Sequence, residues 1–523
     1  MADKYEKYSK EELVRLLRER DRKPRFGLVW ERDEIDHDKS VNGDFVALDF
    51  QKELSCGDAP YRNLLIEGDN FDALRYLRMT HAGKIKCIYI DPPYNTGNKD
   101  FIYNDRFVDK DDLYRHSKWL EYMYRRLEIA RDLLTEDGVI FVSIGEDEIH
   151  ELGLLMEHVF AGLQKIGTFV WRTRQSADSR NQTGASIDHE YVLCFGQRLK
   201  GTPIDEDKFS NPDSDPRGAW RSADMTGLAT KDKRPNLHYD LKNEETGEIY
   251  LCPPKGWRYE PKTMQKLIKE KRVLWPANTD GRPRLKKFLK ELKSNRKGFS
   301  SILDVPLTAE GGKELAEVDL RNQFSFPKPS GLIKELVGQV CEPNDIVLDF
   351  FAGSGTTAKA VLDLNGEDEG TRRFILVSST EATGEEPDKN ICRDVCAKRI
   401  ERTGGDFAYL RARRIPIETI FTKIQHDQVW LALQLIHSDT ISPYQKGDAF
   451  QVQEVEKDKL VIYLPKMTDA ALNDIKKKIN KGKEAVIYSW QPALLKERLG
   501  KSGITYEPIP QFLVDRFGAG AKK

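Results

Sequence analysis

The stretch IKCIYIDPPY, residues 85–94, is typical of a buried strand that ends in a rigid corner. The apolar run 85–90 has the length of a strand, and Asp91-Pro92-Pro93-Tyr94 ends it. Neither proline has an N–H, and each ring fixes φ at about −65°, so the carbonyls of this corner are held stiffly. The plain alternative is an ordinary strand followed by a Pro-Pro turn.

A second stretch, IVLDFFAGSGTT at residues 346–357, predicts another strand and corner. Asp349 ends the apolar run, Ala352-Gly353-Ser354-Gly355 allows a tight turn, and a helix is expected from Thr357. Such a unit places a ligand at the helix N-terminus and the carboxyl end of the strand. The glycines alone are weak evidence, because they complete neither a dinucleotide fingerprint nor a phosphate-binding loop.

The first corner suits chemistry on an exocyclic amino group. The amine of adenine or cytosine is a poor nucleophile, and two acceptors on its N–H bonds return electron density to nitrogen. Asp91 offers a carboxylate, Pro92 offers a carbonyl, and Tyr94 offers a flat face for a base turned out of a duplex. Such stacking stabilises a base by about 1–3 kcal/mol. The two corners can cooperate only if they lie at adjacent strand ends.

Four segments together resemble a known family: 63–144, 326–329 (FPKP), 349–357 and 373–377 (RFILV). They are similar to β-class DNA adenine methyltransferases, and most to the modification subunits of type III restriction–modification systems. The resemblance covers roughly residues 1–405. It implies a Rossmann-like α/β fold with permuted motif order, an inserted target-recognition domain and a small C-terminal α+β domain. It also implies adenine N6 as the target, since Asp rather than Ser at position 91 leans toward adenine over cytosine N4.

The resemblance implies roles for individual residues. Asp91 and Pro92 would polarise the target amine, with Pro93 in the same corner, and Tyr94 would stack on the base. The cofactor would be S-adenosyl-L-methionine. The expected cofactor-binding residues are Asp69, Lys328, Asp349, Phe351, Ala352, Gly353, Ser354, Gly355, Thr356 and Glu381. Glu381 is the candidate for the ribose-binding acid, although residues 378–380 separate it from the preceding strand.

Length and pattern predict several domains. With 523 residues, about three to four domains are expected. The predicted segments are an N-terminal helix and arm (1–44), a catalytic half (45–165), a target-recognition domain (166–325), a cofactor-binding half (326–405) and a C-terminal interaction or dimerisation domain (406–523). Among individual elements we expect a helix over 113–134 and a strand over 139–144. In the C-terminal domain we expect a hairpin over 450–465, helices over 469–480 and 491–499, and strands over 485–490 and 504–507.

The net charge of −1 conceals a strongly basic tract. Residues 255–298 contain 15 Lys or Arg and 4 Asp or Glu, and Trp257, Tyr259, Trp275 and Phe288 lie among them. Basic side chains with interleaved aromatics suit backbone contact and base stacking, although charge runs are usually solvated surface. The candidate DNA-binding residues are Arg172, Arg174, Arg180, Arg221, Arg282, Arg284, Lys286 and Lys287. His189 and Glu190 are expected to have structural roles, since methyl transfer from a sulfonium needs little acid–base chemistry.

Composition bears on location and partners. We expect a cytoplasmic, DNA-associated bacterial or archaeal protein, because the start is charged and no apolar stretch approaches ~18 residues. Seven scattered cysteines favour reduced thiols over a metal site. The expected partners are double-stranded DNA, a second copy of the chain and a restriction (helicase–nuclease) subunit. The open alternatives are a cytosine-N4 or RNA amino-methyltransferase, a catalytically silent DNA-recognition or assembly subunit, and a nicotinamide-dependent oxidoreductase.

Overall fold

The computed structural model describes residues 8–15, 28–32, 35, 37–38, 40–97, 101–103, 106–179, 184–381, 388–456, 459–479, 484–500 and 503–518. The chain divides into two compact units, a large unit of residues 1–199 with 300–523 and a small unit of residues 200–299. The small unit is narrower than the segment 166–325 expected for target recognition. Residues 166–199 and 300–325 pack with the large unit instead.

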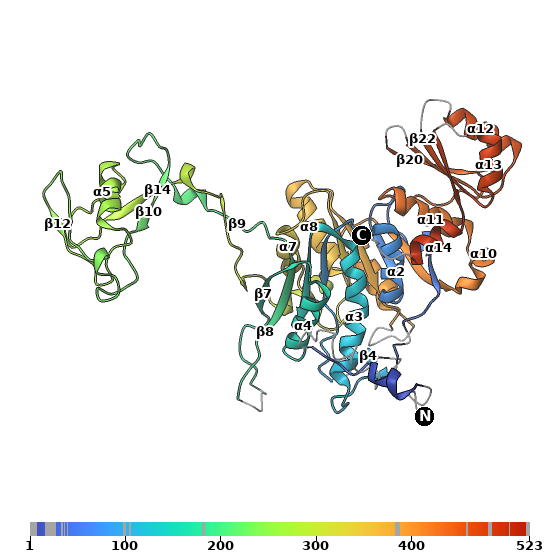
Figure 1. The fold of residues 1–523 in the computed structure, drawn as a ribbon, viewed down its shortest axis with the longest axis horizontal. Coiled ribbons are helices and arrows are strands. Elements are labelled where there is room, and N and C mark those ends of the chain that lie inside the picture. The colour runs from blue at the N-terminus through green and yellow to red at the C-terminus, as the bar shows by residue number, and fades with distance from the viewer. Residues whose placement is uncertain are drawn as a thin grey trace. The chain divides into compact units, whose positions relative to one another are not determined.

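The large unit is built on one mixed sheet (Figure 1). In spatial order its strands are β1 (Phe45–Phe50), β19 (Ala408–Ile415), β2 (Leu64–Glu67), β18 (Arg373–Ser378), β17 (Ile346–Asp349), β3 (Ile85–Ile90), β6 (Leu134–Ile144), β8 (His189–Gly196), β7 (Gln164–Arg172) and β16 (Ile302–Leu303). The six strands from β19 to β6 run parallel to one another, and β8 runs antiparallel to both of its neighbours. The predicted parallel α/β sheet is confirmed.

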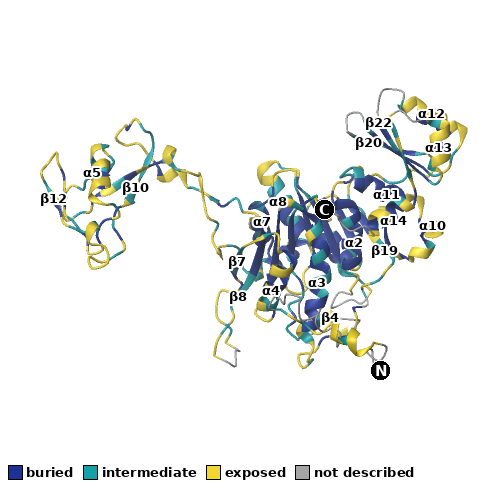
Figure 2. Cartoon of the chain, in the orientation of Figure 1, coloured by how far each residue is buried: buried dark blue, intermediate teal, exposed yellow. Residues whose placement is uncertain are grey.

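Helices cover both faces of this sheet. One face packs in a single hydrophobic cluster with α2 (Asn70–His81), α3 (Arg115–Leu133), α4 (Ile149–Val159) and α11 (His426–His437). The other face carries α7 (Ser330–Gly338) and α8 (Thr356–Asp368), which contact each other, β3 and β18 and lie outside that cluster. The central strands are therefore buried on both sides (Figure 2), which explains their continuous apolar runs.

Shorter elements also belong to the large unit. They are β4 (Ile102–Tyr103), β5 (Arg106–Phe107), α6 (Thr308–Glu317), a π-helix (Ile391–Cys396), α9 (Ala397–Arg402) and α10 (Ile420–Lys423). At the N-terminus Ser9 and Glu12 form a capping box, with Ser9 N–H donating to Glu12 Oε2 at 2.8 Å and Glu12 N–H donating to Ser9 Oγ at 3.2 Å. None of the helices that the structure describes is both long and apolar enough to cross a membrane.

The C-terminal region begins later than the expected boundary at residue 405, because β19 is still a strand of the main sheet. A second sheet follows with the order β20 (Gln451–Glu456), β21 (Lys459–Leu464), β22 (Glu484–Ser489) and β23 (Ile504–Pro508). The helices of this region are α12 (Asp469–Ile479), α13 (Pro492–Leu499) and α14 (Gln511–Gly518). The predicted hairpin, helices and strands of this region are confirmed to within a few residues.

The small unit has its own core. A three-stranded sheet, β10 (Trp220–Asp224), β14 (Arg284–Phe288) and β13 (Val273–Leu274), accompanies α5 (Pro261–Lys269). Two strand pairs complete the unit, β11 (Leu241–Lys242) with β12 (Ile249–Tyr250) and β9 (Thr202–Pro203) with β15 (Arg296–Lys297). Trp257 and Phe288 are fully buried, and Trp257 Nε1 donates to the Tyr239 carbonyl at 2.7 Å. These two aromatics are core residues, so the expectation that they interleave with the charges as a stacking surface is wrong.

Candidate active site

The two corners singled out in the sequence meet at one edge of the main sheet. β3 and β17 are parallel hydrogen-bonded neighbours, with Cys87 opposite Val347 and Ile88 opposite Leu348. Because parallel strands end at the same edge, Asp91 and Asp349 leave the sheet side by side. The predicted proximity of the two motifs, far apart in the sequence, is confirmed.

The Asp91–Tyr94 corner is held from several sides. Trp119 Nε1 donates to the Pro93 carbonyl at 2.7 Å, and the Tyr94 hydroxyl lies 3.0 Å from Asp91 Oδ1. The Tyr94 ring packs against the backbone of Gly145, where a Cβ would lie 2.9 Å from ring atom Cδ2. Burial raises the pKa of Tyr94 well above its ordinary value, so its hydroxyl stays a donor. The corner is a preorganised unit.

Lys328 lies between two carboxylates at this corner. Its Nζ is 2.9 Å from Asp91 Oδ2 and 3.2 Å from Glu190 Oε2. The Tyr94 hydroxyl also lies 2.8 Å from Glu190 Oε2. Burial lowers the pKa of Lys328, but the two carboxylates outweigh it and raise that pKa above its ordinary value. Sequence reasoning gave Glu190 a structural role only, since nothing local marks the start of β8 as part of the site.

Asp349 organises the glycine turn from within. Its Oδ1 accepts the Phe351 N–H at 2.9 Å, and its Oδ2 accepts the Thr357 hydroxyl at 2.5 Å. Burial raises the pKa of Asp349 to about 7, although these two bonds oppose the rise. Asp349 therefore shapes the turn and the first residues of α8, and its carboxylate is committed to the chain itself.

Gly353 and Gly355 are required by the backbone of this turn. Their φ angles are 48° and 81°, in the left-handed region that favours glycine. A Cβ would lie 2.8 Å from the ring of Phe324 at Gly353 and 2.9 Å from Cys396 Sγ at Gly355. The neighbouring Ala352 N–H donates to the Val377 carbonyl of β18 at 3.0 Å. The turn is thus packed tightly between β18 and the segments that carry Phe324 and Cys396.

The hydroxyls of Ser354 and Thr356 point into the protein. Arg399 Nη1 donates to Ser354 Oγ at 3.0 Å and to Thr356 Oγ1 at 2.8 Å. Arg399 Nη2 pairs with Glu314 Oε2 at 2.6 Å, and Glu314 in turn accepts the Ser330 hydroxyl at 2.8 Å. All five residues are buried. The side chains of Ser354 and Thr356 are therefore structural, and only their main chains are left to contact a ligand.

Asp69 caps the helix that follows β2. Its Oδ1 accepts the N–H of Phe71 at 2.8 Å, and its Oδ2 lies 3.5 Å from Arg126 Nη2. The next residue, Asn70, donates to the Phe350 carbonyl at 3.0 Å and accepts from Arg126 Nε at 2.5 Å. Asn70 thus ties the end of β2 to the glycine turn, a link that sequence reasoning missed because asparagine after a strand is common.

Two acidic residues lie at the carboxyl ends of the neighbouring strands β2 and β18. Glu381 follows β18 with an exposed side chain, and its carbonyl accepts the Ile391 N–H at 2.9 Å. Glu67, the last residue of β2, is buried and accepts from the Tyr409 hydroxyl at 2.6 Å and Arg411 Nη2 at 3.0 Å. Since Glu67 is already bound within the protein, Glu381 stays the candidate acid for a ligand hydroxyl.

Two of the predicted DNA-binding arginines of the large unit lie just after or at the end of β7. Arg172 Nε donates to the Arg174 carbonyl at 2.9 Å, and Arg174 Nη1 pairs with Asp178 Oδ2 at 2.8 Å. Both side chains are exposed, and an exposed pair contributes little energy, so both remain able to contact phosphate. Arg180 lies outside the described residues.

The basic candidates of the small unit are split by strand register. Arg221 of β10 stands opposite Lys287 of β14, so these two share one face of the sheet. Arg284 lies on the other face, where its Nε donates to Ser222 Oγ at 2.6 Å, and Arg282 is exposed just before β14. Lys286 is only 7% exposed.

Lys286 is a structural cation. Its Nζ pairs with Asp213 and lies 3.2 Å from Asp215 Oδ2. The prediction that Lys286 binds DNA is therefore wrong, because those two carboxylates already hold its side chain inside the unit.

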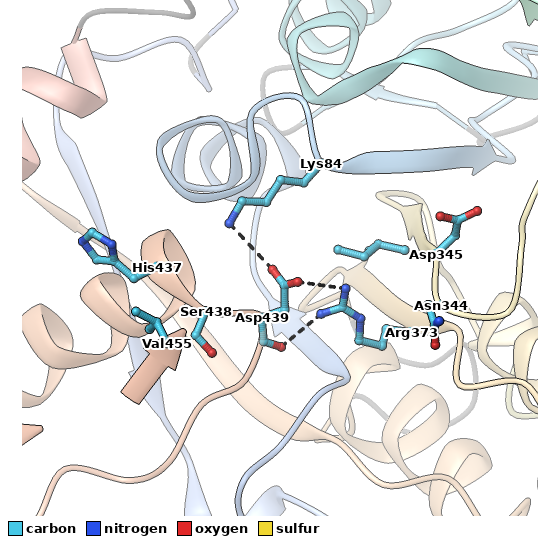
Figure 3. Close-up of a pocket in the computed structure, with 9 residues that line it drawn as sticks. Lys84, Asn344, Asp345, Arg373, His437, Ser438, Asp439 and Val455 are labelled. Carbon is cyan, nitrogen blue, oxygen red and sulfur yellow. Dashed lines mark hydrogen bonds and ion pairs between the residues drawn. The ribbon is translucent and has the colours of Figure 1, made fainter. Parts of the chain in front are cut away.

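A pocket of about 480 Å³ lies at the opposite edge of the main sheet. Its lining includes the residues that precede β3 and β17, the first residue of β18 and the end of α11. Lys84 and Arg373 both point at Asp439, at 3.7 Å and 3.0 Å (Figure 3). This pocket is remote from the Asp91 corner. Within the described part of the chain, no group of three or more His, Cys, Asp or Glu is placed to hold a metal ion.

Comparison with known proteins agrees with this geometry. A family model for DNA methylases matches residues 85–395, which include Asp91, Lys328 and Asp349. The chain is 32% identical to the StyLTI Mod subunit of a type III restriction–modification enzyme from Salmonella typhimurium, over 61% of this chain and 53% of that protein. It is 29% identical to the EcoP15I Mod subunit of Escherichia coli, over 62% of this chain and 60% of that protein.

The chain thus spans about half to three fifths of the length of these two relatives. It is also 32% identical to the type II methyltransferase M.KpnI of Klebsiella pneumoniae, over 64% of this chain and 84% of that protein. The family model covers more than half of the chain, and the residues of both corners fall within it. The chain belongs to the DNA methylase family.

Proposed function

We propose that this chain transfers a methyl group from S-adenosyl-L-methionine to adenine N6 within a specific sequence of duplex DNA. The observation that supports this most is the adjacency of β3 and β17, which brings the Asp91 corner beside the glycine turn. Asp91, which would polarise the target amine, then lies next to the glycine turn that would receive the cofactor. Membership of the DNA methylase family agrees with this reaction.

The residues at this edge fit that cofactor. S-adenosylmethionine carries an ammonium and a sulfonium, and Asp69, Asp91 and Glu381 follow three strands whose ends lie along the same edge. Asp349 shapes the turn at the N-terminus of α8, where main-chain N–H groups suit a carboxylate. Phe351 is half-buried beside Tyr122, with ring centroids 6.2 Å apart, and offers an apolar wall.

The chain acts mainly on the target base. When bound, the cofactor supplies a methyl group activated by a positively charged sulfur. Asp91 and the Pro92 carbonyl accept the two N–H bonds of the target amine and stabilise the positive charge that develops on nitrogen. Tyr94 offers its ring to a base turned out of the duplex, a displacement that enzymes acting on bases require. Since Trp119 and Gly145 already fix this corner, little reorganisation is needed when the base arrives.

Type III modification is the system we propose for this chain. Two relatives are named Mod subunits of type III restriction–modification enzymes, whereas M.KpnI is a type II methyltransferase. In this proposal residues 200–299 take part in recognition of the DNA sequence. Residues 416–523 serve dimerisation or docking of a restriction subunit. The activity is placed in the bacterial or archaeal cytoplasm.

The test uses the full chain and labelled cofactor. The purified protein is incubated with plasmid DNA, matched RNA and S-adenosylmethionine, and the modified base is identified by mass spectrometry and single-molecule sequencing. N6-methyladenine in one sequence context supports the proposal. Detection of N4-methylcytosine, or of label in RNA alone, would show that the target is not adenine N6 in DNA. Cofactor binding without methyl transfer would indicate a catalytically silent recognition subunit.

A further inference from the structure

Four side chains from three segments of the chain meet at the Asp91 corner. Asp91 and Tyr94 follow β3, Glu190 lies in β8, and Lys328 precedes α7. Lys328 Nζ bridges Asp91 Oδ2 at 2.9 Å and Glu190 Oε2 at 3.2 Å. The Tyr94 hydroxyl lies 3.0 Å from Asp91 Oδ1 and 2.8 Å from Glu190 Oε2, and its single proton is shared between these two acceptors. Each acid thus contacts the same ammonium, and the two acids share the proton of one hydroxyl.

The position of Lys328 matters for the reaction. Its ammonium lies 4.9 Å from the centroid of the Tyr94 ring and on one oxygen of Asp91. An amine of a stacked base needs the same two features, a carboxylate acceptor and that aromatic face. The Lys328 side chain is only 10% exposed, so it has little freedom to leave for solvent. Glu190 is a second acceptor within its reach, at 3.2 Å.

Resting on the proposed methyl transfer, we propose that Lys328 and Glu190 are positioning residues for it. In the free site the Lys328 ammonium orients the Asp91 carboxylate. When the target amine arrives at Asp91, Lys328 shifts its hydrogen bonds toward Glu190 and stays in the site. Glu190 therefore frees the Asp91 acceptor, and the Lys328 ammonium offsets the repulsion between the two neighbouring carboxylates.

The charge balance of the methyl transfer explains why Lys328 and Glu190 are needed. The new nitrogen–carbon bond forms as the carbon–sulfur bond breaks, the sulfur keeps that electron pair, and the nitrogen becomes cationic. The nitrogen then releases a proton to Asp91, from which it passes to water. Asp91, Glu190 and Lys328 together carry a charge of −1 when all are ionised, which favours a cation throughout. Among the described residues, Tyr89, Tyr94 and Asp349 also interact electrostatically with one or both of these acids.

Removing Lys328 leaves two adjacent carboxylates. Two adjacent like charges raise the pKa of one of the acids, so the pair would take up a proton at a higher pH than in the wild type, and Asp91 would lose the ammonium that orients it. In Lys328→Met we expect single-turnover methylation at pH 7 to fall by about 10²-fold, with the acidic limb of the pH–rate profile moved up by about one unit or more. Lys328→Arg should restore much of the profile. Glu190→Gln should reduce the rate by about tenfold and leave the acidic limb lower than in Lys328→Met.

The experiment measures single-turnover rates from pH 5.5 to 9, cofactor affinity by calorimetry and melting temperature for each variant. The surface pair Lys334 and Glu367, 2.5 Å apart, supplies the matched controls Lys334→Met and Glu367→Gln. These controls should keep the wild-type profile. Cofactor affinity should change less than about threefold in all variants, because the pair acts on the base side of the site.

The outcomes separate this role from the proposed function. An active wild type with unchanged pH profiles in Lys328→Met and Glu190→Gln overturns the positioning role alone. Loss of cofactor affinity in Lys328→Met, with a normal rate at saturating cofactor, makes Lys328 a cofactor ligand and also overturns it. A wild type that methylates no nucleic acid overturns the proposed function and this role with it.

Discussion

The two edges of the main sheet both gather charged residues, but they do so in opposite ways. At the carboxyl edge two acids, Asp91 and Glu190, share one lysine. At the amino edge two cations, Lys84 and Arg373, share one acid, Asp439. The first arrangement leaves negative charge beside a glycine turn and an aromatic face. The second joins the core to the segment after α11.

The difference shows that charge at strand ends does not by itself mark a site. Lys84 Nζ also donates to the carbonyls of Leu435 and Ile436, at 3.3 Å and 3.2 Å, so main-chain groups take up much of its hydrogen-bonding capacity. Asp91 instead lies beside Tyr94, where we propose that the target base binds. We therefore expect substitutions at the carboxyl edge to alter reaction rates and those at the amino edge to alter stability.

The largest effect is expected for Asp91→Ala. Loss of the acceptor for the target amine should lower methylation by about 10³-fold, since the developing charge loses its main stabilising group. Cofactor affinity, measured by calorimetry, should stay within a few-fold of the wild type. Substantial remaining methylation would contradict the role given to Asp91, with Asp345→Ala at the amino edge as the control.

Arg399→Met should act on stability and on the cofactor site together. It leaves Glu314 buried without its cation, and breaking such a pair typically costs about 3–5 kcal/mol. It also releases the hydroxyls of Ser354 and Thr356, so the glycine turn should loosen and cofactor affinity should fall. Denaturant unfolding and calorimetry measure the two effects. A stable variant with unchanged affinity would show that the turn does not depend on this network.

Glu148→Gln should change how stability depends on pH. Burial raises the pKa of Glu148 from 4.5 to about 8. The unfolded chain ionises this group at lower pH than the folded chain, so the wild type loses stability as pH rises from about 4.5 to about 8.

The glutamine variant lacks that loss and can still accept the Asn95 Nδ2 hydrogen bond, which is 2.5 Å long. Its stability relative to the wild type should therefore rise across this window, by up to a few kcal/mol. Unfolding at pH 5 and pH 8 measures the change. A pH-independent difference between the two proteins would show that Glu148 is ionised in the fold.

Asp439→Ala should weaken the amino edge without touching the reaction. Lys84 and Arg373 would lose their shared carboxylate, and because Asp439 is 40% exposed the expected cost is about 1–2 kcal/mol. The methylation rate per folded molecule should be unchanged. A rate loss as large as that of Lys328→Met would contradict the expectation that the amino edge affects stability and not the reaction.

The smallest effect is expected in the small unit, where Lys287 and Lys286 form a matched pair. Lys287→Ala removes an exposed charge, so it should lower DNA affinity modestly and reduce the salt dependence of binding by about one unit of slope. Lys286→Ala removes the partner of Asp213 and Asp215 and should mainly destabilise residues 200–299. Filter binding at several salt concentrations and thermal unfolding separate the two. Equal salt slopes in both variants would contradict the distinction.

The sequence by itself was sufficient for the features that depend on local pattern. The strands before Asp91 and Asp349 were predictable because apolar runs followed by Pro or Gly corners leave few other conformations. The helices and strands after Phe450 were also predictable from local pattern, since each has a clear hydrophobic period and is followed by a turn. Resemblance added the order of the motifs, from which the adjacency of the two corners followed.

Tertiary structure alone decided which charges meet. Lys286 lies in a basic tract like its neighbour Lys287, but strand alternation turns it toward Asp213 and Asp215. Glu190 reaches Lys328 only because β8 runs antiparallel beside β6 and places its first residues at the edge where β3 ends. The membership of β19 in the main sheet is likewise set by pairing with β1 and β2. Local sequence determines the period of each helix or strand. Packing determines which residues from distant parts of the chain become neighbours, and the charge balance of the site depends on those neighbours.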